Sequence, residues 1–150
     1  LKKKKGDEEI MSKIAVVYWS GTGNTEAMAE EVANGAKAAG AEVESFTTDD
    51  FAADKMNDYD AVAFGCPAMG DEVLEEDEFE PLFEDCKAKL SGKKIALFGS
   101  YGWGDGEWMR NWEEDCKTAG AILACDPVIC NDEPDDDAKE ACQNLGKALA

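Results

Sequence analysis

Short runs of apolar residues alternate with amphipathic helical segments along this chain, and this alternation limits the fold more than any other feature. The runs at residues 61–64 and 95–98 are apolar at every position, so both faces of these strands must be covered. Strands of this kind separated by helices form a parallel sheet with right-handed crossovers. We therefore expect an α/β fold: a doubly wound, five-stranded parallel sheet of order 2-1-3-4-5 with helices on both faces.

Apolar periodicity and the residues that end each segment give the expected elements. Strands are expected at residues 14–19, 43–47, 60–65, 95–98 and 122–125, the last resuming near 128–130. Helices are expected at residues 25–39, 79–89, 107–119 and 137–149, with a short helical turn near 51–55. Residues 11–150 then form one domain. Residues 1–10 lack apolar periodicity and are expected to be a disordered extension or the remnant of a tag.

Composition excludes several functions. The chain has 34 acidic and 15 basic residues, a formal charge of −19, and no His. Without His there is no Ser-His or Cys-His catalytic pair and no His metal site. The negative field disfavours nucleic acid and anionic membranes and favours basic partner surfaces. Six cysteines without a Cys-x-x-Cys pair indicate free thiols, with no metal bound. There is no apolar segment of membrane length and no signal peptide, so we expect a cytoplasmic monomer.

The first expected strand runs into Ser20-Gly21-Thr22-Gly23-Asn24-Thr25, and a helix follows. A helix N-terminus with free amides and flanking hydroxyls suits a phosphate. The segment has no Lys and is not the phosphate loop of nucleoside triphosphatases. From these residues alone, a phosphate site and an ordinary turn with Thr25 as the N-cap are equally possible.

Specialised loops also follow the third and fourth strands. Cys66-Pro67-Ala68-Met69-Gly70-Asp71-Glu72 comes after the third strand, and residues 100–108, with two Trp, one Tyr and three Gly, come after the fourth. The carboxyl ends of these strands meet at one edge of the sheet, beside the topological switch point. A flat aromatic ligand stacked on Trp103 would explain this composition. The alternative is that Tyr101 and Trp103 fold back and cover the strand ends.

The three motifs together resemble the flavodoxin family, in its short-chain, clostridial type. They are Tyr18 to Glu26, Ala68 to Glu72 and Phe98 to Gly104, and the likeness extends over residues 11–150. It implies a flavodoxin-like fold, bound flavin mononucleotide (FMN), and one-electron shuttling between redox enzymes through oxidised, semiquinone and hydroquinone states. It implies an electron-transfer protein rather than an enzyme, with no catalytic residues and with basic docking surfaces on its redox partners.

The resemblance also implies roles for individual residues. The loop from Ser20 to Thr25 would hold the phosphate, and Ser100 would complete that shell. Trp103 and Met69 would cover the two faces of the flavin, and Glu72 would accept the flavin N3–H. The cofactor-binding residues implied are Ser20, Gly21, Thr22, Gly23, Asn24, Thr25, Pro67, Ala68, Met69, Gly70, Asp71, Glu72, Ser100, Tyr101, Gly102, Trp103, Gly104 and Asn131.

Two features of the residues suit one-electron chemistry. Gly70 can adopt a positive φ, so that the Gly70–Asp71 peptide can rotate and offer its carbonyl to the flavin. A crowd of carboxylates disfavours the reduced, anionic flavin and lowers the second potential. These carboxylates are expected along one solvated rim, at Glu72, Glu75, Glu76, Asp77, Glu78 and Glu80, with Asp132, Glu133 and Asp135 to Asp137 opposite.

Two other functions stay open. A flavodoxin-like FMN quinone reductase or nitroreductase would use the same fold, but it needs a pocket above the flavin, whereas this chain uses its loops to cover the ring. A flavin-free acidic signalling domain would need an acidic pocket after the first strand, where this chain has Ser20-Gly21-Thr22-Gly23.

Overall fold

The main sheet is parallel, with the strand order β4-β3-β5-β6-β7, and β8 pairs with β6 on the same side as β7. This is the order 2-1-3-4-5 expected from the sequence, with the last strand in two pieces. The structure is a computed structural model that describes residues 2–3, 9–10 and 12–150. Its strands are β3 (Lys13–Tyr18), β4 (Glu42–Thr47), β5 (Ala61–Gly65), β6 (Lys94–Tyr101), β7 (Ile122–Leu123) and β8 (Val128–Asn131).

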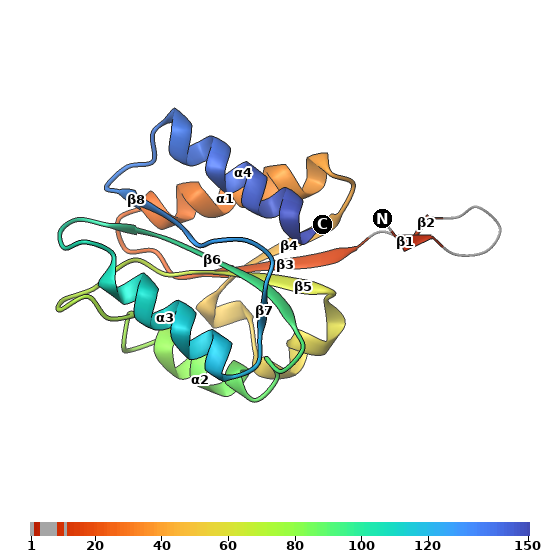
Figure 1. Ribbon diagram of the computed structural model, residues 1–150, viewed down its shortest axis with the longest axis horizontal. Helices are drawn as coiled ribbons and strands as arrows, with labels where there is room; N and C mark the ends of the chain where they lie inside the picture. Colours follow the sequence, from red (N-terminus) through yellow and green to blue (C-terminus); the bar gives the residue numbers. More distant parts are fainter. Residues whose placement is uncertain (1, 4–8, 11) are drawn as a thin grey trace.

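Two helices cover each face of the sheet (Figure 1). The helices α1 (Asn24–Ala38) and α4 (Asp136–Leu149) pack together over one face, and α2 (Phe79–Lys87) and α3 (Glu107–Thr118) cover the other. Each face has its own buried apolar cluster. All five residues of β5 are buried, because this central strand has neighbours on both sides and helices on both faces.

The structure differs from the sequence expectation at two places. The strand β6 continues to Tyr101, three residues beyond the expected end, because β8 pairs with its last four residues from Phe98 to Tyr101. Ser100 and Tyr101 are therefore held in the sheet rather than in the following loop. The expected helical turn near 51–55 is replaced by two 3-10 turns, Thr48–Asp50 and Ala53–Asp58.

Within the first eleven residues, β1 (Lys2–Lys3) and β2 (Glu9–Ile10) pair with each other as a separate antiparallel sheet. Residues 1, 4–8 and 11 lie outside the described part of the chain. The prediction that residues 1–10 are an extension outside the domain stays a prediction.

Candidate functional site

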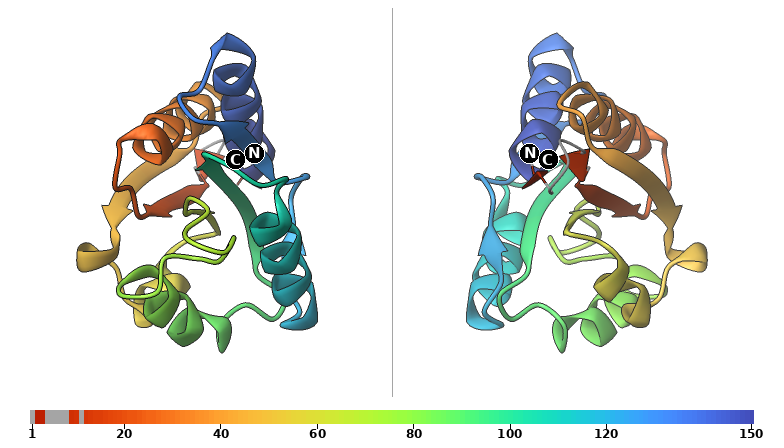
Figure 2. Two further views of the ribbon diagram at one scale, coloured as in Figure 1. Left: turned by 90° about the vertical axis from the view of Figure 1, so that its left-hand side faces the viewer. Right: turned by 90° about the vertical axis from the view of Figure 1, so that its right-hand side faces the viewer.

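A cavity of about 200 Å³ opens at the carboxyl edge of the sheet, which faces the viewer in the left view of Figure 2. Three loops far apart in the sequence supply its walls: the loop before α1, the loop after β5, and the segment from the end of β6. The site is therefore at the topological switch point, where open α/β sheets bind their ligands. The lining residues are Trp19, Gly21, Thr22, Asn24, Pro67, Ala68, Met69, Ser100, Tyr101, Gly102 and Asp132.

The loop before α1 is closed by the hydroxyl of Ser20. Its Oγ accepts hydrogen bonds from the amides of Gly23, at 3.1 Å, and Glu26, at 3.2 Å. Gly23 is the N-cap of α1, with φ of 96°, a left-handed conformation that favours glycine. The amides of Gly21, Thr22 and Thr25 have no acceptor among the described residues. The N-terminus of α1 thus presents free donors toward the cavity, as an anion site requires.

Thr25 is not the N-cap that the simple-turn interpretation assigns to it. The helix begins one residue earlier, and Thr25 is only 1% exposed. Its Oγ1 accepts the amide hydrogen of Ser100 at 3.4 Å, which joins the start of α1 to the end of β6. The Thr25 hydroxyl therefore ties two walls of the cavity together, and its backbone amide is the part left for a ligand.

The loop after β5 forms the second wall. The backbone amides and carbonyls of Met69 and Val73 bond each other in both directions, at 2.8 and 3.0 Å, so residues 69–73 form a tight reversal. Gly70 lies in this reversal with φ of 48°, as the sequence predicts. The Ala68 amide donates to the Ser100 carbonyl at 3.0 Å and fixes the base of the loop on β6.

Glu72 is directed at the start of α3. Its backbone has φ of 59°, an uncommon conformation for a residue with a Cβ. Its Oε1 accepts from the amides of Gly106, at 3.1 Å, and Glu107, at 2.9 Å. The side chain thus caps α3, whereas the sequence resemblance implies a role for it toward the flavin N3–H. Because one oxygen serves both amides, Oε2 is left for a second partner.

Glu75 is not on the solvated rim where the sequence analysis put it. The residue is 6% exposed, and its carboxylate accepts the amides of Asp77 at 2.9 Å and of Glu78 and Phe79 at 2.8 Å each. Its own amide donates to the Cys66 thiol at 3.4 Å. The Glu75 carboxylate therefore caps α2 and obtains the donors that a buried carboxylate needs. Its backbone amide holds the far end of the loop after β5 against Cys66.

The end of β6 supplies the third wall. Ser100 is 4% exposed, and its hydroxyl donates to the Asp132 carbonyl at 2.6 Å. Trp103 lies beyond the lining residues and is 61% exposed, so it does not fold back over the strand ends. Asn131, which the sequence analysis proposed, is exposed and does not line the cavity, whereas the next residue, Asp132, does.

Sequence reasoning did not include Trp19 or Asp132 among the cofactor-binding residues, and it placed Asp132 only on the acidic rim, whereas both line the cavity. For Trp19 a signal was present, because a large aromatic side chain at the carboxyl end of the first strand stands beside any ligand bound there. For Asp132 the signal was weak. Its place depends on the pairing of β8 with β6 and on its own φ of 58°.

The electrostatics of the cavity are set by neutral donors. The lining residues include no Lys or Arg, and Asp132 is the one acid among them. All six cysteines are free, and burial raises the pKa of Cys86, Cys116 and Cys142 to about 12. These thiols stay protonated near neutral pH. In the described part of the chain, no group of acidic or thiol side chains has the arrangement of a metal site, and no helix is long and apolar enough to cross a membrane.

Comparison with known proteins gives one consistent answer. The family model described as "Flavodoxin" matches residues 16–146. The flavodoxin of Clostridium beijerinckii is 50% identical over 135 residues, which are 90% of this chain and 97% of that protein. The solution structure of two-electron reduced Megasphaera elsdenii flavodoxin superposes with a TM-score of 0.84 at 50% identity, covering 91% of this chain and 97% of that one.

Of the three functions that the sequence left open, the comparisons support the electron carrier. The doubly wound sheet, the unpaired amides at the start of α1 and the aromatic-flanked cavity suit such a carrier. The chain belongs to the flavodoxin family, and it is an FMN-binding electron carrier that serves redox partner proteins and is not an enzyme.

Proposed function

We propose that the cavity at the carboxyl edge holds the FMN and that the three loops divide its parts between them. The observation that carries this proposal is the convergence of the three loops on one cavity that has unpaired amides at one side and an exposed indole beyond it. A cavity of about 200 Å³ is smaller than a typical enclosed ligand site, so it takes only part of a mononucleotide. The remainder lies toward Trp103.

The phosphate belongs at the start of α1. The amides of Gly21, Thr22 and Thr25 are available there, and the Ser20 hydroxyl, which already accepts two amides, still has a hydrogen to donate. Thr22 and Asn24 line the cavity with further polar groups. Neutral donors and the helix dipole hold the phosphate without a cation, so its negative charge stays close to the flavin.

The flavin ring belongs between the loop after β5 and the segment after β6. Met69 lines the cavity and offers a flexible apolar cover on one side, and the exposed indole of Trp103 offers a flat surface on the other. Glu72 Oε2 and the Gly70–Asp71 peptide are the nearby acceptors. The bound flavin supplies one-electron transfer, and these residues set its orientation, its hydrogen bonds and the charge around it.

Amide chemical shifts of the apoprotein test this division directly, with three ligands compared. Inorganic phosphate should move the amide signals of Gly21, Thr22 and Thr25. Riboflavin, which lacks the phosphate, should move those of Met69, Gly70 and the Trp103 indole, and FMN should move both groups. If phosphate shifts a different part of the chain, or if riboflavin and FMN shift the same signals, the division is wrong.

We propose further that the redox partners dock through basic surfaces and that the carrier works as a monomer. The charge of −19 supports both, because it attracts basic surfaces and separates like copies. Part of this charge lies on the loop after β5 (residues 66–78), which we call the flavin loop. Its acids include Asp71, Glu76 and Asp77. We also propose a cytoplasmic location, supported by six cysteines that are all free thiols.

A further inference from the structure

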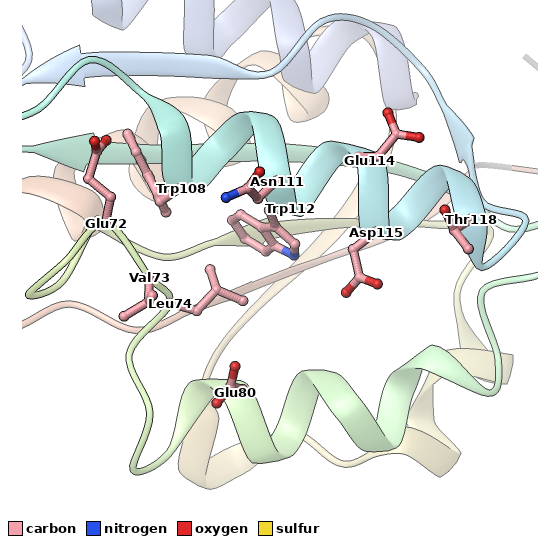
Figure 3. Close-up of a pocket in the computed structure, with 10 residues that line it drawn as sticks. All are labelled: Glu72, Val73, Leu74, Glu80, Trp108, Asn111, Trp112, Glu114, Asp115 and Thr118. Atoms are coloured by element: carbon pink, nitrogen blue, oxygen red, sulfur yellow. The ribbon is translucent and has the colours of Figure 1, made fainter.

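A second hollow, a groove of about 480 Å³, lies between α2 and α3, and residues 72–74 of the loop after β5 line one end of it (Figure 3). The two hollows share no lining residue. Glu72, however, lines the groove while its loop neighbour Met69 lines the cavity. A molecule bound in the groove would therefore lie against the loop that holds the flavin.

The walls of the groove have one sign of charge. Glu80 comes from α2, and Glu114 and Asp115 come from α3, and the described residues that line the groove include no Lys or Arg. Asp115 is already paired, since its Oδ2 is 2.9 Å from Lys87 Nζ. Glu80 and Glu114 have no ion pair with any described residue. Figure 3 shows the Glu114 carboxylate on the side of α3 that faces away from α2, so Glu80 is the unpaired charge available to a cation between the helices.

The floor of the groove is apolar and includes one unsatisfied donor. Leu74 is half-buried there, and Trp112 is 2% exposed. Trp112 Nε1 is buried and has no hydrogen-bond partner among the described residues. Figure 3 shows the nitrogen edge of this indole turned toward the groove. Trp108, by contrast, donates its Nε1 hydrogen to the Cys66 carbonyl at 3.1 Å. Buried donors are almost always paired, so the Trp112 N–H indicates an acceptor that binds in the groove.

We propose that this groove anchors an arginine of a redox partner protein. The apolar stem of the arginine lies on Leu74, its guanidinium meets Glu80 on the α2 wall, and its main-chain carbonyl accepts the Trp112 N–H. A long basic side chain combines an apolar stem with a charged end, as this groove requires. The inference rests on the proposed docking through basic surfaces and gives it a specific position beside the flavin loop.

The test is a titration of the FMN-loaded protein with N-acetyl-arginine methylamide, followed by the indole ¹⁵N–¹H signals. The Trp112 signal should move downfield as its N–H gains an acceptor, while the Trp108 signal, whose N–H is already bonded, should stay in place. The control ligand is N-acetyl-citrulline methylamide, which has the same shape and carbonyl but no charge. It should bind at least several-fold more weakly.

Two matched variants of α2 locate the site. Glu80→Gln should weaken binding of the arginine probe by about twofold to fivefold, the usual effect of one exposed ion pair. Asp85→Asn removes the same charge from an exposed position of α2 that does not line the groove and has no ion pair with any described residue. This change should leave the binding nearly unchanged.

Three outcomes would overturn the proposal: a Trp112 signal that does not move, equal binding of the citrulline probe, or equal weakening by Glu80→Gln and Asp85→Asn. The absorbance of bound FMN and the amide signals of the phosphate loop are read in the same samples. Loss of these signals would count against the proposed cofactor site, whereas their persistence with an unmoved Trp112 would count against the groove alone.

Discussion

The N-termini of α1 and α2 differ in what accepts hydrogen bonds from their first backbone amides. At α2, the Glu75 carboxylate takes the amides of Asp77, Glu78 and Phe79 at 2.8 to 2.9 Å. At α1, only the neutral hydroxyl of Ser20 closes the loop, and three amides stay unpaired. Both ends attract negative charge through the helix dipole. The chain supplies that charge at α2 and leaves it to the ligand at α1.

The other two long helices follow α2. Glu72 caps α3 through the amides of Gly106 and Glu107, and Asp135 caps α4 through the amide of Ala138 at 2.8 Å. Glu26 lies in the first turn of α1, but its carboxylate bonds none of these amides. In a chain with 34 acidic residues, a helix start without a carboxylate cap therefore supports the proposed phosphate site more strongly than the loop composition does.

The largest effect is expected when α1 is made to resemble the other helices. The change Thr22→Asp puts a carboxylate where we propose that the phosphate binds, at a side chain that in the native chain accepts only the Asn24 amide at 3.5 Å. The apoprotein should gain about 0.5 to 1 kcal/mol of stability from the new cap. FMN binding should weaken by about 4 kcal/mol, roughly a thousandfold, because two anions then share one site.

Urea unfolding of the apoprotein and fluorescence titrations with FMN and with riboflavin measure the two effects of Thr22→Asp. Thr22→Asn is the uncharged control and should change FMN affinity far less. Riboflavin affinity should hardly change in either variant, because this ligand has no phosphate. Equal losses for FMN and riboflavin would show that the substitution damages the site in general and would contradict the charge argument.

The next effect is expected when α2 loses its cap. Glu75→Ala leaves three amides without their carboxylate and should lower the free energy of unfolding by about 2 to 3 kcal/mol. The backbone amide of Glu75 still donates to the Cys66 thiol in this variant, so FMN affinity should change less than stability does. The adjacent Glu76 is exposed, and Glu76→Ala should change stability by less than about 0.5 kcal/mol. Urea unfolding of the two variants measures the contrast, and similar losses in both would contradict the cap.

The contrast between Glu75 and Glu76 also separates what the sequence predicts from what it does not. Apolar runs predicted the sheet order and all four long helices, because a strand covered on both faces leaves few alternatives. The carboxyl-edge rule then brought Thr22 and Met69 together correctly. Nothing in the acidic run from Asp71 to Glu80 distinguishes Glu75 from Glu76, since both look like parts of a solvated face. Which of them turns inward depends on the reversal at residues 69–73 and on the position of α2.

The residues at the ends of β6 and β8 were harder to predict, because their positions also depend on contacts distant in sequence. Ser100 and Tyr101 belong to β6 only because β8 returns beside them, which is a contact distant in sequence. That pairing also moves Asp132, rather than Asn131, to the cavity. Local propensity predicts that a strand exists, but the number of residues it includes is decided by its neighbour in the sheet.

The smallest effect is expected at Glu72, which stands between the two kinds of helix start. One of its oxygens caps α3, and we propose that the other accepts from the flavin. In Glu72→Gln the single amide oxygen can serve α3 or the flavin, but not both. The apoprotein should therefore keep its cap and lose only about 0.5 kcal/mol of stability, while FMN and riboflavin both bind about tenfold more weakly.

Glu107→Gln is the control, an exposed acid in the first turn of α3 that should leave both affinities unchanged. If Glu72→Gln destabilises the apoprotein and leaves flavin affinity intact, Glu72 serves α3 alone, and the three acid-capped helices form one class with no share in the cofactor site.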